Sequence, residues 1–411
     1  MSSSLRDQPR APGGSPLQRA GEVLEASLQL GLTSFGGPIA HLGYFERAYV
    51  RQRRWLSAGQ YAGIVALCQV LPGPASSQVG FLIGLKRAGW PGALAAWLGF
   101  TLPSALIMYA GAGLAARLHG PLAAAALHGL KLLALAVVAQ AVASMARRLC
   151  PDLPRAAIAV ATAALLLAAG GAATQLAALA AGAIAGLLVC RDTAAPSLEL
   201  VIPVSPRGAW LALTLFALLL AGLPVLAAQH PHGLVALADI FYRAGALVFG
   251  GGHVVLPLLR DALVPGGSIT DEQFLTGYGL AQVVPGPLFS LAAYLGATAS
   301  DVQPAAAAAG GAAVGIVFIF LPGLLLAVAG AVLFSRAARH VSVRAGLAGI
   351  NAAVVGLLAA ALYDPLWKTA VHGVTDFGVA ALALLLLAQW RVPPVVVAAV
   401  CVALSAIGAL A

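Results

Sequence analysis

The stretch Gln69-Val70-Leu71-Pro72-Gly73-Pro74 lies inside an apolar segment, and a second stretch, Gln282-Val283-Val284-Pro285-Gly286-Pro287, lies inside another. Proline removes a backbone donor and blocks a helix, and glycine loosens it. Within a bilayer a freed backbone group finds no water, so such a break persists only where it is buried in protein or lines a wet cavity. Two matched breaks therefore predict one site to which both segments contribute.

The composition around these breaks is that of a membrane protein. Of the 411 residues, 61% are hydrophobic and only 9% are charged, and the mean hydropathy is +0.93. Apolar runs long enough to cross a bilayer recur along nearly the whole chain, so we expect an all-α polytopic protein of about 11–13 transmembrane segments. No room remains for a soluble domain, and no catalytic or nucleotide-binding motif occurs, so we expect neither an enzyme nor a cofactor.

The formal net charge of +9 has an ordinary cause in such a protein. The arginines lie in short loops, which is typical of the positive-inside bias and does not indicate nucleic-acid binding. The four cysteines show neither a CxxC pattern nor metal-ligand spacing, so we interpret them as unpaired apolar residues and expect no metal. They are Cys68, Cys150, Cys190 and Cys401.

The order of landmarks restarts halfway along the chain. Phe249-Gly250-Gly251 repeats Phe35-Gly36-Gly37 at a shift of 214 residues (35 to 249), and the two Pro-Gly-Pro stretches are 213 apart (69 to 282). Leu321-Pro322 follows them as Leu102-Pro103 follows the first pair. Such a duplication is the pattern on which many transporter folds are built. We divide the chain into a disordered cytoplasmic-like tail (1–20), a first repeat (21–190), a linker with an extra helix (191–230) and a second repeat (231–411).

Charges predict how the two repeats are oriented. Equivalent loops carry opposite charge, which predicts inverted repeats; six segments per repeat and one extra helix would produce that inversion. Yet both ends of the first Pro-Gly-Pro segment are basic, so both ends are expected on the same side of the membrane, as in a re-entrant hairpin. One such hairpin in each repeat would remove one span per repeat. The two repeats would then have the same orientation unless another segment also fails to span. Kink and hairpin both remain open at this point. The residues concerned are Arg47, Arg51, Arg53, Arg54, Lys86 and Arg87 around the first break, and Asp261, Asp271, Glu272 and Asp301 around the second.

Glycines and polar residues near the breaks are candidates for an anion pathway. Consecutive glycines let the backbone open and turn N–H groups toward an anion, although close helix packing is the alternative. His41 and His253, which follow the glycines, could carry protons or serve as hydrogen-bond donors. Gln69 and Gln282 could bind an oxyanion, or satisfy the broken backbone, which we favour. The candidate pathway residues are Phe35, Gly36, Gly37, Pro38, His41, Gln69, Pro72, Gly73, Pro74, Gly250, Gly251, Gly252, His253, Gln282, Pro285, Gly286 and Pro287.

Charged residues inside apolar segments are costly and usually face a cavity. Glu25 and Asp239 are equivalent under the 214-residue shift (25 to 239). Arg243 lies one helical turn after Asp239, so the spacing predicts an ion pair. Lys131 could attract an anionic substrate, or extend its amine to the interface. The remaining candidates are Glu46 and Arg47, which could act as gate residues or be solvated at the interface.

These motifs together resemble those of the chromate ion transporter family in its long, two-domain form, and the resemblance extends from about residue 21 to the end of the chain. It rests on Ser34-Phe35-Gly36-Gly37-Pro38, Phe249-Gly250-Gly251-Gly252-His253 and the two Pro-Gly-Pro stretches. The resemblance implies a multi-pass protein of the bacterial inner membrane with antiparallel halves. It further implies export of chromate, driven by a proton gradient or the membrane potential, and resistance to chromate.

Physical chemistry agrees with an oxyanion substrate but does not choose among oxyanions. An interior-negative potential drives anions outward at about 2.3 kcal/mol per charge per 100 mV. Sulfate has nearly the shape and charge of chromate, so a sulfate or other oxyanion carrier is the first alternative, and a passive anion channel is the second. A membrane reductase would need a redox group, for which there is no signature. The expected partners are the substrate anion and the lipid bilayer, with a homodimer as the expected form if the chain assembles.

Overall fold

The computed structural model describes residues 14–35, 37–117, 120–169, 171–190, 202–249, 252–299, 305–337 and 340–410, and these residues form helices and no strand. The elements of the first repeat are α1 (Pro16–Thr33), α2 (Gly37–Phe45), η1 (Glu46–Gln52), α3 (Ala58–Val70), α4 (Ala75–Ala115), α5 (Pro121–Leu149), α6 (Leu153–Ala169) and α7 (Gly171–Val189). The expected all-α class is confirmed.

The second repeat follows an extra helix, α8 (Pro206–Gln229). Its elements are α9 (Leu234–Leu247), η2 (Gly252–Val254), α10 (Val255–Leu263), α11 (Asp271–Val283), η3 (Leu288–Ser290), α12 (Leu291–Thr298), α13 (Ala305–Ala337), α14 (Val341–Ala361), η5 (Leu362–Trp367), α15 (Lys368–Ala370), α16 (Val374–Ala388) and α17 (Pro394–Leu410).

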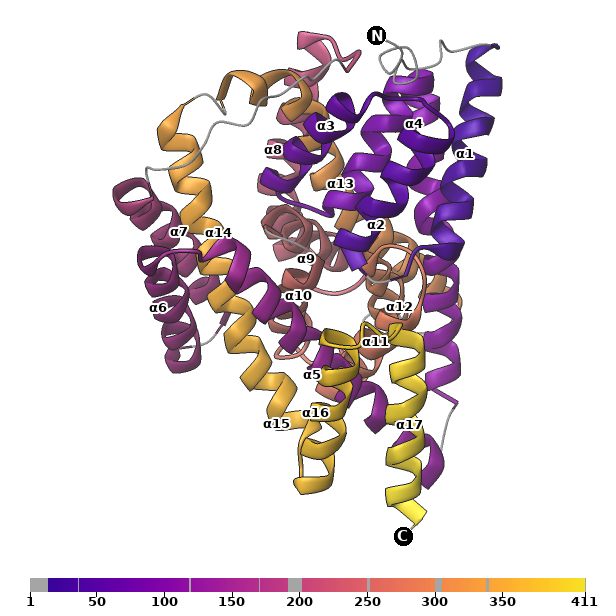
Figure 1. Ribbon diagram of the computed structural model, residues 1–411, viewed down its shortest axis with the longest axis vertical. Coiled ribbons are helices and arrows are strands. Elements are labelled where there is room, and N and C mark those ends of the chain that lie inside the picture. The colour runs from indigo at the N-terminus through magenta and orange to yellow at the C-terminus, as the bar shows by residue number, and fades with distance from the viewer. Residues whose placement is uncertain are drawn as a thin grey trace.

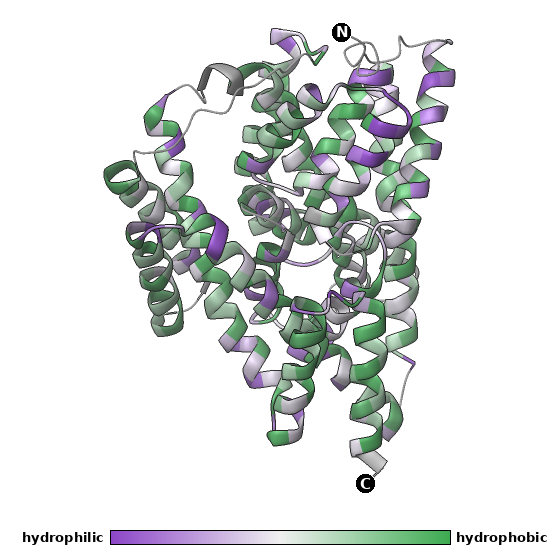
Figure 2. Cartoon of the chain, viewed as in Figure 1, coloured by the Kyte–Doolittle hydropathy of each residue, from purple (hydrophilic) through white to green (hydrophobic). Residues whose placement is uncertain are grey.

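Several of these helices suit a bilayer by length and composition. Within the described part of the chain, five are long and apolar enough to cross it, and shorter apolar helices of 10–17 residues accompany them. The five are Ala75–Ala115, Pro121–Leu149, Pro206–Gln229, Ala307–Leu333 and Val341–Ala370. Hydrophobic residues cover most of the outer helices α6, α7, α8 and α17 (Figure 2). The chain is therefore a multi-pass membrane protein.

The first Pro-Gly-Pro stretch is the tip of a re-entrant hairpin. The guanidinium of Arg87, beyond the second leg, lies 5.2 Å from the ring of Trp55, which precedes the first leg α3. The chain then turns back at Ala88 and Gly89, where the helical backbone of α4 is interrupted. A Cβ at Gly84 would lie only 2.3 Å from the carbonyl oxygen of Gly92, so the two parts of α4 pack side by side. The basic residues on both flanks therefore share one face, as the hairpin hypothesis required.

The preceding segment doubles back as well, and this resolves the orientation of the repeats. Ser27 Oγ of α1 lies 3.0 Å from Tyr49 Oη of η1, beyond the Phe-Gly-Gly break. We expected six segments in each repeat. The number of spans is smaller, because the segment from α1 to η1 returns to the side of the membrane from which it entered. Among the described residues, five helices then lie between the two sets of hairpins, and an odd number of spans inverts the second repeat. They are the second part of α4, α5, α6, α7 and α8.

The second repeat has the matching hairpin. A Cβ at Gly277 of α11 would lie 2.4 Å from Cδ1 of Tyr294 of α12, so the two legs run side by side on either side of the second Pro-Gly-Pro. In Figure 1, α1, α2 and α3 lie in the upper half of the molecule and α11 and α12 in the lower half. The two hairpins thus reach the centre from opposite ends.

The sequence starts the two hairpins in the same way. Ser57 and Gln60 form a capping box at the start of α3, and Thr270 and Gln273 form the equivalent one at the start of α11. In a capping box the hydroxyl accepts from an otherwise unpaired amide of the first turn, while the Gln side chain accepts from the cap residue's own amide. The repeated polar residues are therefore helix starts.

Each hairpin tip is held by the other repeat. The amide of Gly73 donates to the carbonyl of Val248 at 2.7 Å, and the amide of Gly286 donates to the carbonyl of Ser34 at 2.9 Å. Ser34 and Val248 are equivalent residues immediately before the two Phe-Gly-Gly breaks, so the bonds are reciprocal. The two repeats are consequently joined by their broken backbones.

The long helices α5 and α14 each pack against helices of the other repeat. Helix α5 packs against α16 and α17, whereas its equivalent α14 packs against α6 and α7. Gly129-Leu130-Lys131 corresponds to Gly349-Ile350-Asn351 at a shift of 220 residues (129 to 349). A Cβ at Gly129 would lie 2.7 Å from Cα of Val402, and one at Gly349 would lie 2.0 Å from the carbonyl oxygen of Gly182. At both positions the neighbouring helix backbone packs directly against the glycine, and a side chain there would clash with it.

We predict that Gly73→Ala destabilises the fold. Gly73 has φ +115°, and its Cβ would lie 2.7 Å from Cα of Gly323, so the substitution strains the tip and pushes the repeats apart. The free energy of unfolding should fall by about 1–3 kcal/mol. Thermal unfolding in detergent measures this, with Gly43→Ala as control because a Cβ there meets nothing within 4 Å. Equal stability of the two variants would contradict the tip contact.

Candidate functional site

A cavity of about 510 Å³ opens where the two hairpins meet. Both repeats line it, with Gly37 and Gly73 from the first and Gly252 and Gly286 from the second. Helix α2 begins at Gly37 and η2, which leads into α10, begins at Gly252. Because the first amides of a helix lack intrahelical acceptors and carry the positive end of its dipole, these two helix starts favour an anion in the cavity.

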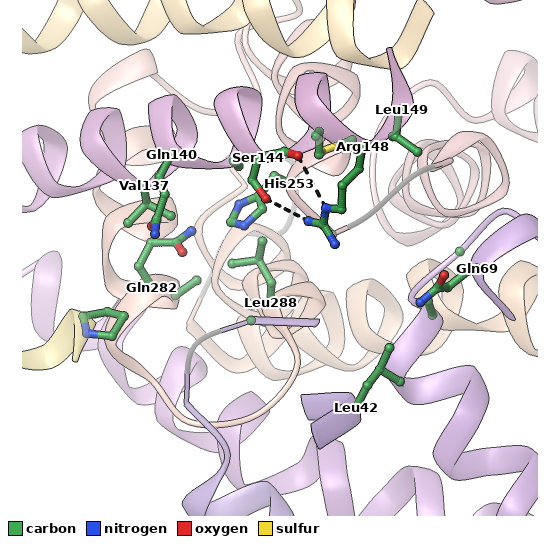
Figure 3. A pocket seen from close by; sticks show the side chains of 18 of the residues that line it. Leu42, Gln69, Val137, Gln140, Ser144, Arg148, Leu149, His253, Gln282 and Leu288 are labelled. Atoms are coloured by element: carbon green, nitrogen blue, oxygen red, sulfur yellow. Dashed lines mark hydrogen bonds between the residues drawn. The ribbon is translucent and has the colours of Figure 1, made fainter. Parts of the chain in front are cut away.

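Arg148 on α5 supplies a full positive charge to this cavity. It is the only Arg or Lys among the described residues that line it. Its Nη2 donates to Ser144 Oγ at 2.9 Å, and no carboxylate in the described part of the chain pairs with it. Figure 3 shows its side chain extending from α5 toward the centre of the cavity. A guanidinium has five N–H donors, so several remain available to an oxyanion.

Glutamine amides surround the same space. Gln69, Gln140 and Gln282 all line the cavity (Figure 3). Nε2 of Gln282 is buried and has no hydrogen-bond partner among the described residues. Because an unpaired buried donor costs free energy, this atom is suited to a substrate oxygen or to water.

The backbone of the first break is satisfied by a different residue from the one we expected. Gln78, four residues beyond Pro74, donates from Nε2 to the carbonyls of Pro72 and Gly323, each at 2.8 Å. The favoured interpretation of Gln69 as the residue that satisfies the break is therefore wrong. Gln69 is exposed to the cavity and free to contact a ligand.

The two candidate histidines lie in different surroundings. His253 lines the cavity, and its Nδ1 is 2.8 Å from the hydroxyl of Tyr278. His41 is buried behind the cavity wall, with Nδ1 3.4 Å from Ser76 Oγ and Nε2 without a partner in the described structure. Of the two, only His253 can contact a molecule in the cavity directly.

The charged candidates lie away from the cavity lining. Asp239 and Arg243 form the predicted ion pair, with Nε to Oδ1 at 2.9 Å. Lys131 Nζ is 3.0 Å from Glu272 Oε1 of the second repeat, so this lysine is neutralised by a partner instead of attracting a substrate alone. Glu46 pairs with Arg51 at 2.8 Å, and Glu25 and Arg47 are exposed. Lys131 was a candidate to attract the anion, whereas the cation that lines the cavity is Arg148.

The other candidates surround the site without lining it or lie outside the described residues. Phe35 is partly buried, and the prolines shape the two tips while only the glycines between them line the cavity. Gly36, Gly250 and Gly251 lie outside the described residues, as does the side chain of Pro38. The prolines concerned are Pro72, Pro74, Pro285 and Pro287.

The signal that could have identified Arg148 is its equivalent in the second repeat. The 220-residue shift relates Ser144 to Asp364 and Arg148 to Lys368 (148 to 368). Lys368 is paired with Asp364 at 2.7 Å, whereas Arg148 has only a serine at that position. Both repeats have a cation at this position, but only Lys368 has a carboxylate one turn before it. This difference distinguishes Arg148 from an ordinary loop arginine.

A multi-pass helical protein of two inverted repeats with broken helices around a central polar cavity has the architecture of a membrane transporter. The Chromate transporter family profile matches residues 21–187 and 235–406, and the chain belongs to this family. The two matched ranges correspond to the two repeats. The resemblance stated from the motifs is confirmed.

Relatives agree over most of the chain. A chromate transport protein of Pseudomonas aeruginosa is 30% identical over 339 residues, covering 82% of this chain and 79% of that protein. A probable chromate transport protein of Synechococcus elongatus is 28% identical over 383 residues, covering 90% of each. A chromate transport protein of Cupriavidus metallidurans is 26% identical over 387 residues, covering 88% and 85%. No solved structure matches the chain.

We predict that Arg148→Gln raises the apparent KM for chromate uptake about tenfold or more, because a charged hydrogen bond contributes about 1.5–3 kcal/mol. Arg148→Lys should retain part of the affinity, since it keeps the charge but loses the planar pair of donors. Uptake rates over a range of chromate concentrations measure both effects. Arg147→Gln is the matched control, as Arg147 is exposed and does not line the cavity. Equal effects at the two positions would exclude Arg148 from the binding site.

Proposed function

We propose that this protein is a secondary transporter that exports chromate across the bacterial inner membrane and thereby confers chromate resistance. The observation that carries the proposal is the Arg148 guanidinium without a carboxylate partner, in a cavity that also holds glutamine amides and two helix starts. A tetrahedral dianion needs donors and positive potential of this kind. Membership of the chromate transporter family supports chromate as the substrate, and the names of the relatives agree.

The two repeats are proposed to move against each other around this cavity. We retain the division into repeats at 21–190 and 231–411, which the two ranges matched by the family profile support. In inverted-repeat transporters, rocking of one repeat exposes a central site first to one side and then to the other. For a dianion, a potential of 100 mV, interior negative, contributes about 4.6 kcal/mol to outward movement.

Transport across vesicles tests the direction and the substrate. Everted membrane vesicles containing the protein should accumulate labelled chromate when energised, and vesicles without it should not. Excess sulfate should compete only weakly if the site prefers chromate. Full competition by sulfate would favour the broader oxyanion carrier, and absence of energised accumulation would contradict export. Flux insensitive to energisation yet carried by the protein would favour a passive anion channel.

Three buried polar side chains of the first repeat are proposed to provide the place where a proton couples to transport. Ser34 Oγ, His41 Nε2 and Thr101 Oγ1 are buried without hydrogen-bond partners among the described residues. The equivalent residues of the second repeat are Val248, Val255 and Phe320, all apolar and buried. Because buried polar atoms are normally paired, these three atoms of the first repeat are suited to bind water or a proton, and their equivalents in the second repeat are not.

We predict that His41→Gln removes the response of chromate flux to an imposed proton gradient, while flux driven by membrane potential alone persists. Glutamine retains hydrogen-bonding capacity but cannot titrate near neutral pH. The measurement compares the two driving forces in the same vesicles. His230→Gln is the control, because His230 is an exposed histidine at the end of α8. An unchanged response in His41→Gln would exclude His41 as the proton carrier.

A further inference from the structure

His128, His372 and Asp376 form a compact cluster far from the anion cavity. His128 lies near the start of α5 in the first repeat, and the other two residues lie at the start of α16 in the second. One potential ligand atom from each residue, an imidazole nitrogen or a carboxylate oxygen, lies within 4.8 Å of the other two. In the searched part of the chain, this is the one group of three His, Cys, Asp or Glu residues with such geometry.

The carboxylate of Asp376 lies near a ring nitrogen of each histidine. Its Oδ1 is 2.8 Å from Nε2 of His128, and its Oδ2 is 3.8 Å from Nδ1 of His372. Oδ2 also accepts from the backbone amide of His372 at 2.9 Å, which holds the carboxylate in place. The rings are stacked with centroids 5.5 Å apart and planes 24° apart. Both rings thus present a nitrogen toward one anchored carboxylate.

We propose that these three residues bind a zinc ion. Two imidazole nitrogens and one carboxylate oxygen are a common ligand set for Zn²⁺, while Mg²⁺ and Ca²⁺ require oxygen ligands. Tetrahedral ligands at zinc–ligand distances of about 2.0–2.1 Å are about 3.3 Å apart, so small side-chain rotations would complete the site. The His372 side chain is 65% exposed, which leaves the fourth position open to water and gives the ion a path of entry.

The ion would fasten one repeat to the other. Helix α5 already contacts the second repeat through Lys131 and Glu272 at 3.0 Å and through Gln140 Nε2, which donates to the carbonyl of Leu387 at 3.2 Å. A zinc ion bound by His128 and by the start of α16 adds a strong link at the end of the same interface. If the repeats move as the proposed transport function requires, this link slows the movement, so Zn²⁺ inhibits transport. The inhibition rests on the proposed function, whereas the binding does not.

Binding is tested on the purified, metal-stripped full-length protein in detergent. Equilibrium dialysis should show one Zn²⁺ bound per chain, and Zn²⁺ but not Mg²⁺ should raise the midpoint of thermal unfolding, because a ligand that binds the folded state stabilises it. His372→Ala removes an exposed ligand and should weaken Zn²⁺ binding about tenfold or more while the protein remains folded. Asp376→Asn should weaken it as well. His230→Ala is the matched control and should bind Zn²⁺ like the unaltered protein.

The outcomes separate the two parts of the inference. Absence of saturable binding, or equal binding by the unaltered protein and His372→Ala, would overturn the zinc site. In vesicles, Zn²⁺ should slow chromate flux for the unaltered protein and for His230→Ala but not for His372→Ala. Normal flux in the presence of bound Zn²⁺ would overturn the link between the repeats. If the protein transports no chromate, the proposed function fails while the binding measurement still decides the site.

Discussion

The reciprocal backbone hydrogen bonds, from Gly73 to Val248 and from Gly286 to Ser34, are the constraint on which the rest of the structure depends. Helix breaks in a membrane protein are tolerated only where the freed groups find partners. Here each repeat provides the partner for the break in the other, and Gln78 adds two further bonds at the first tip. The breaks therefore join the repeats, and they place four glycines around one central cavity.

The two repeats of this duplicated scaffold differ at positions that the proposed transport function uses. Arg148 lacks the carboxylate that pairs with its equivalent, Lys368. That carboxylate, Asp364, also lines a separate cavity of about 310 Å³, together with Arg260 and Asp261. The two repeats thus share their order of breaks, while the charge beside the equivalent cations differs. In the proposed transport function, the substrate anion binds in the cavity whose cation, Arg148, has no carboxylate partner among the described residues.

Much of the fold could be predicted from the sequence because the decisive residues are local. Proline and glycine break helices wherever they stand, so the two Pro-Gly-Pro stretches were recognisable without tertiary information. The ion pair of Asp239 and Arg243 followed from their spacing of one turn. The partners of Lys131 and His128 are 141 and 248 residues away, and no local pattern indicates such contacts. For the same reason no local spacing indicated the proposed zinc site, whose ligands His128, His372 and Asp376 come from both repeats.

By itself the sequence determined the membrane environment, the duplication, the positions of the breaks and the family. These depend on composition and on order along the chain, which folding does not change. Only the tertiary structure decided that the first segment also doubles back, that Gln78 and not Gln69 satisfies the first break, and that Arg148 faces the cavity. The physical reason is that helices apolar on nearly all sides carry no stripe to mark their inner face. Which polar residue faces the substrate is then set by packing between helices distant in sequence.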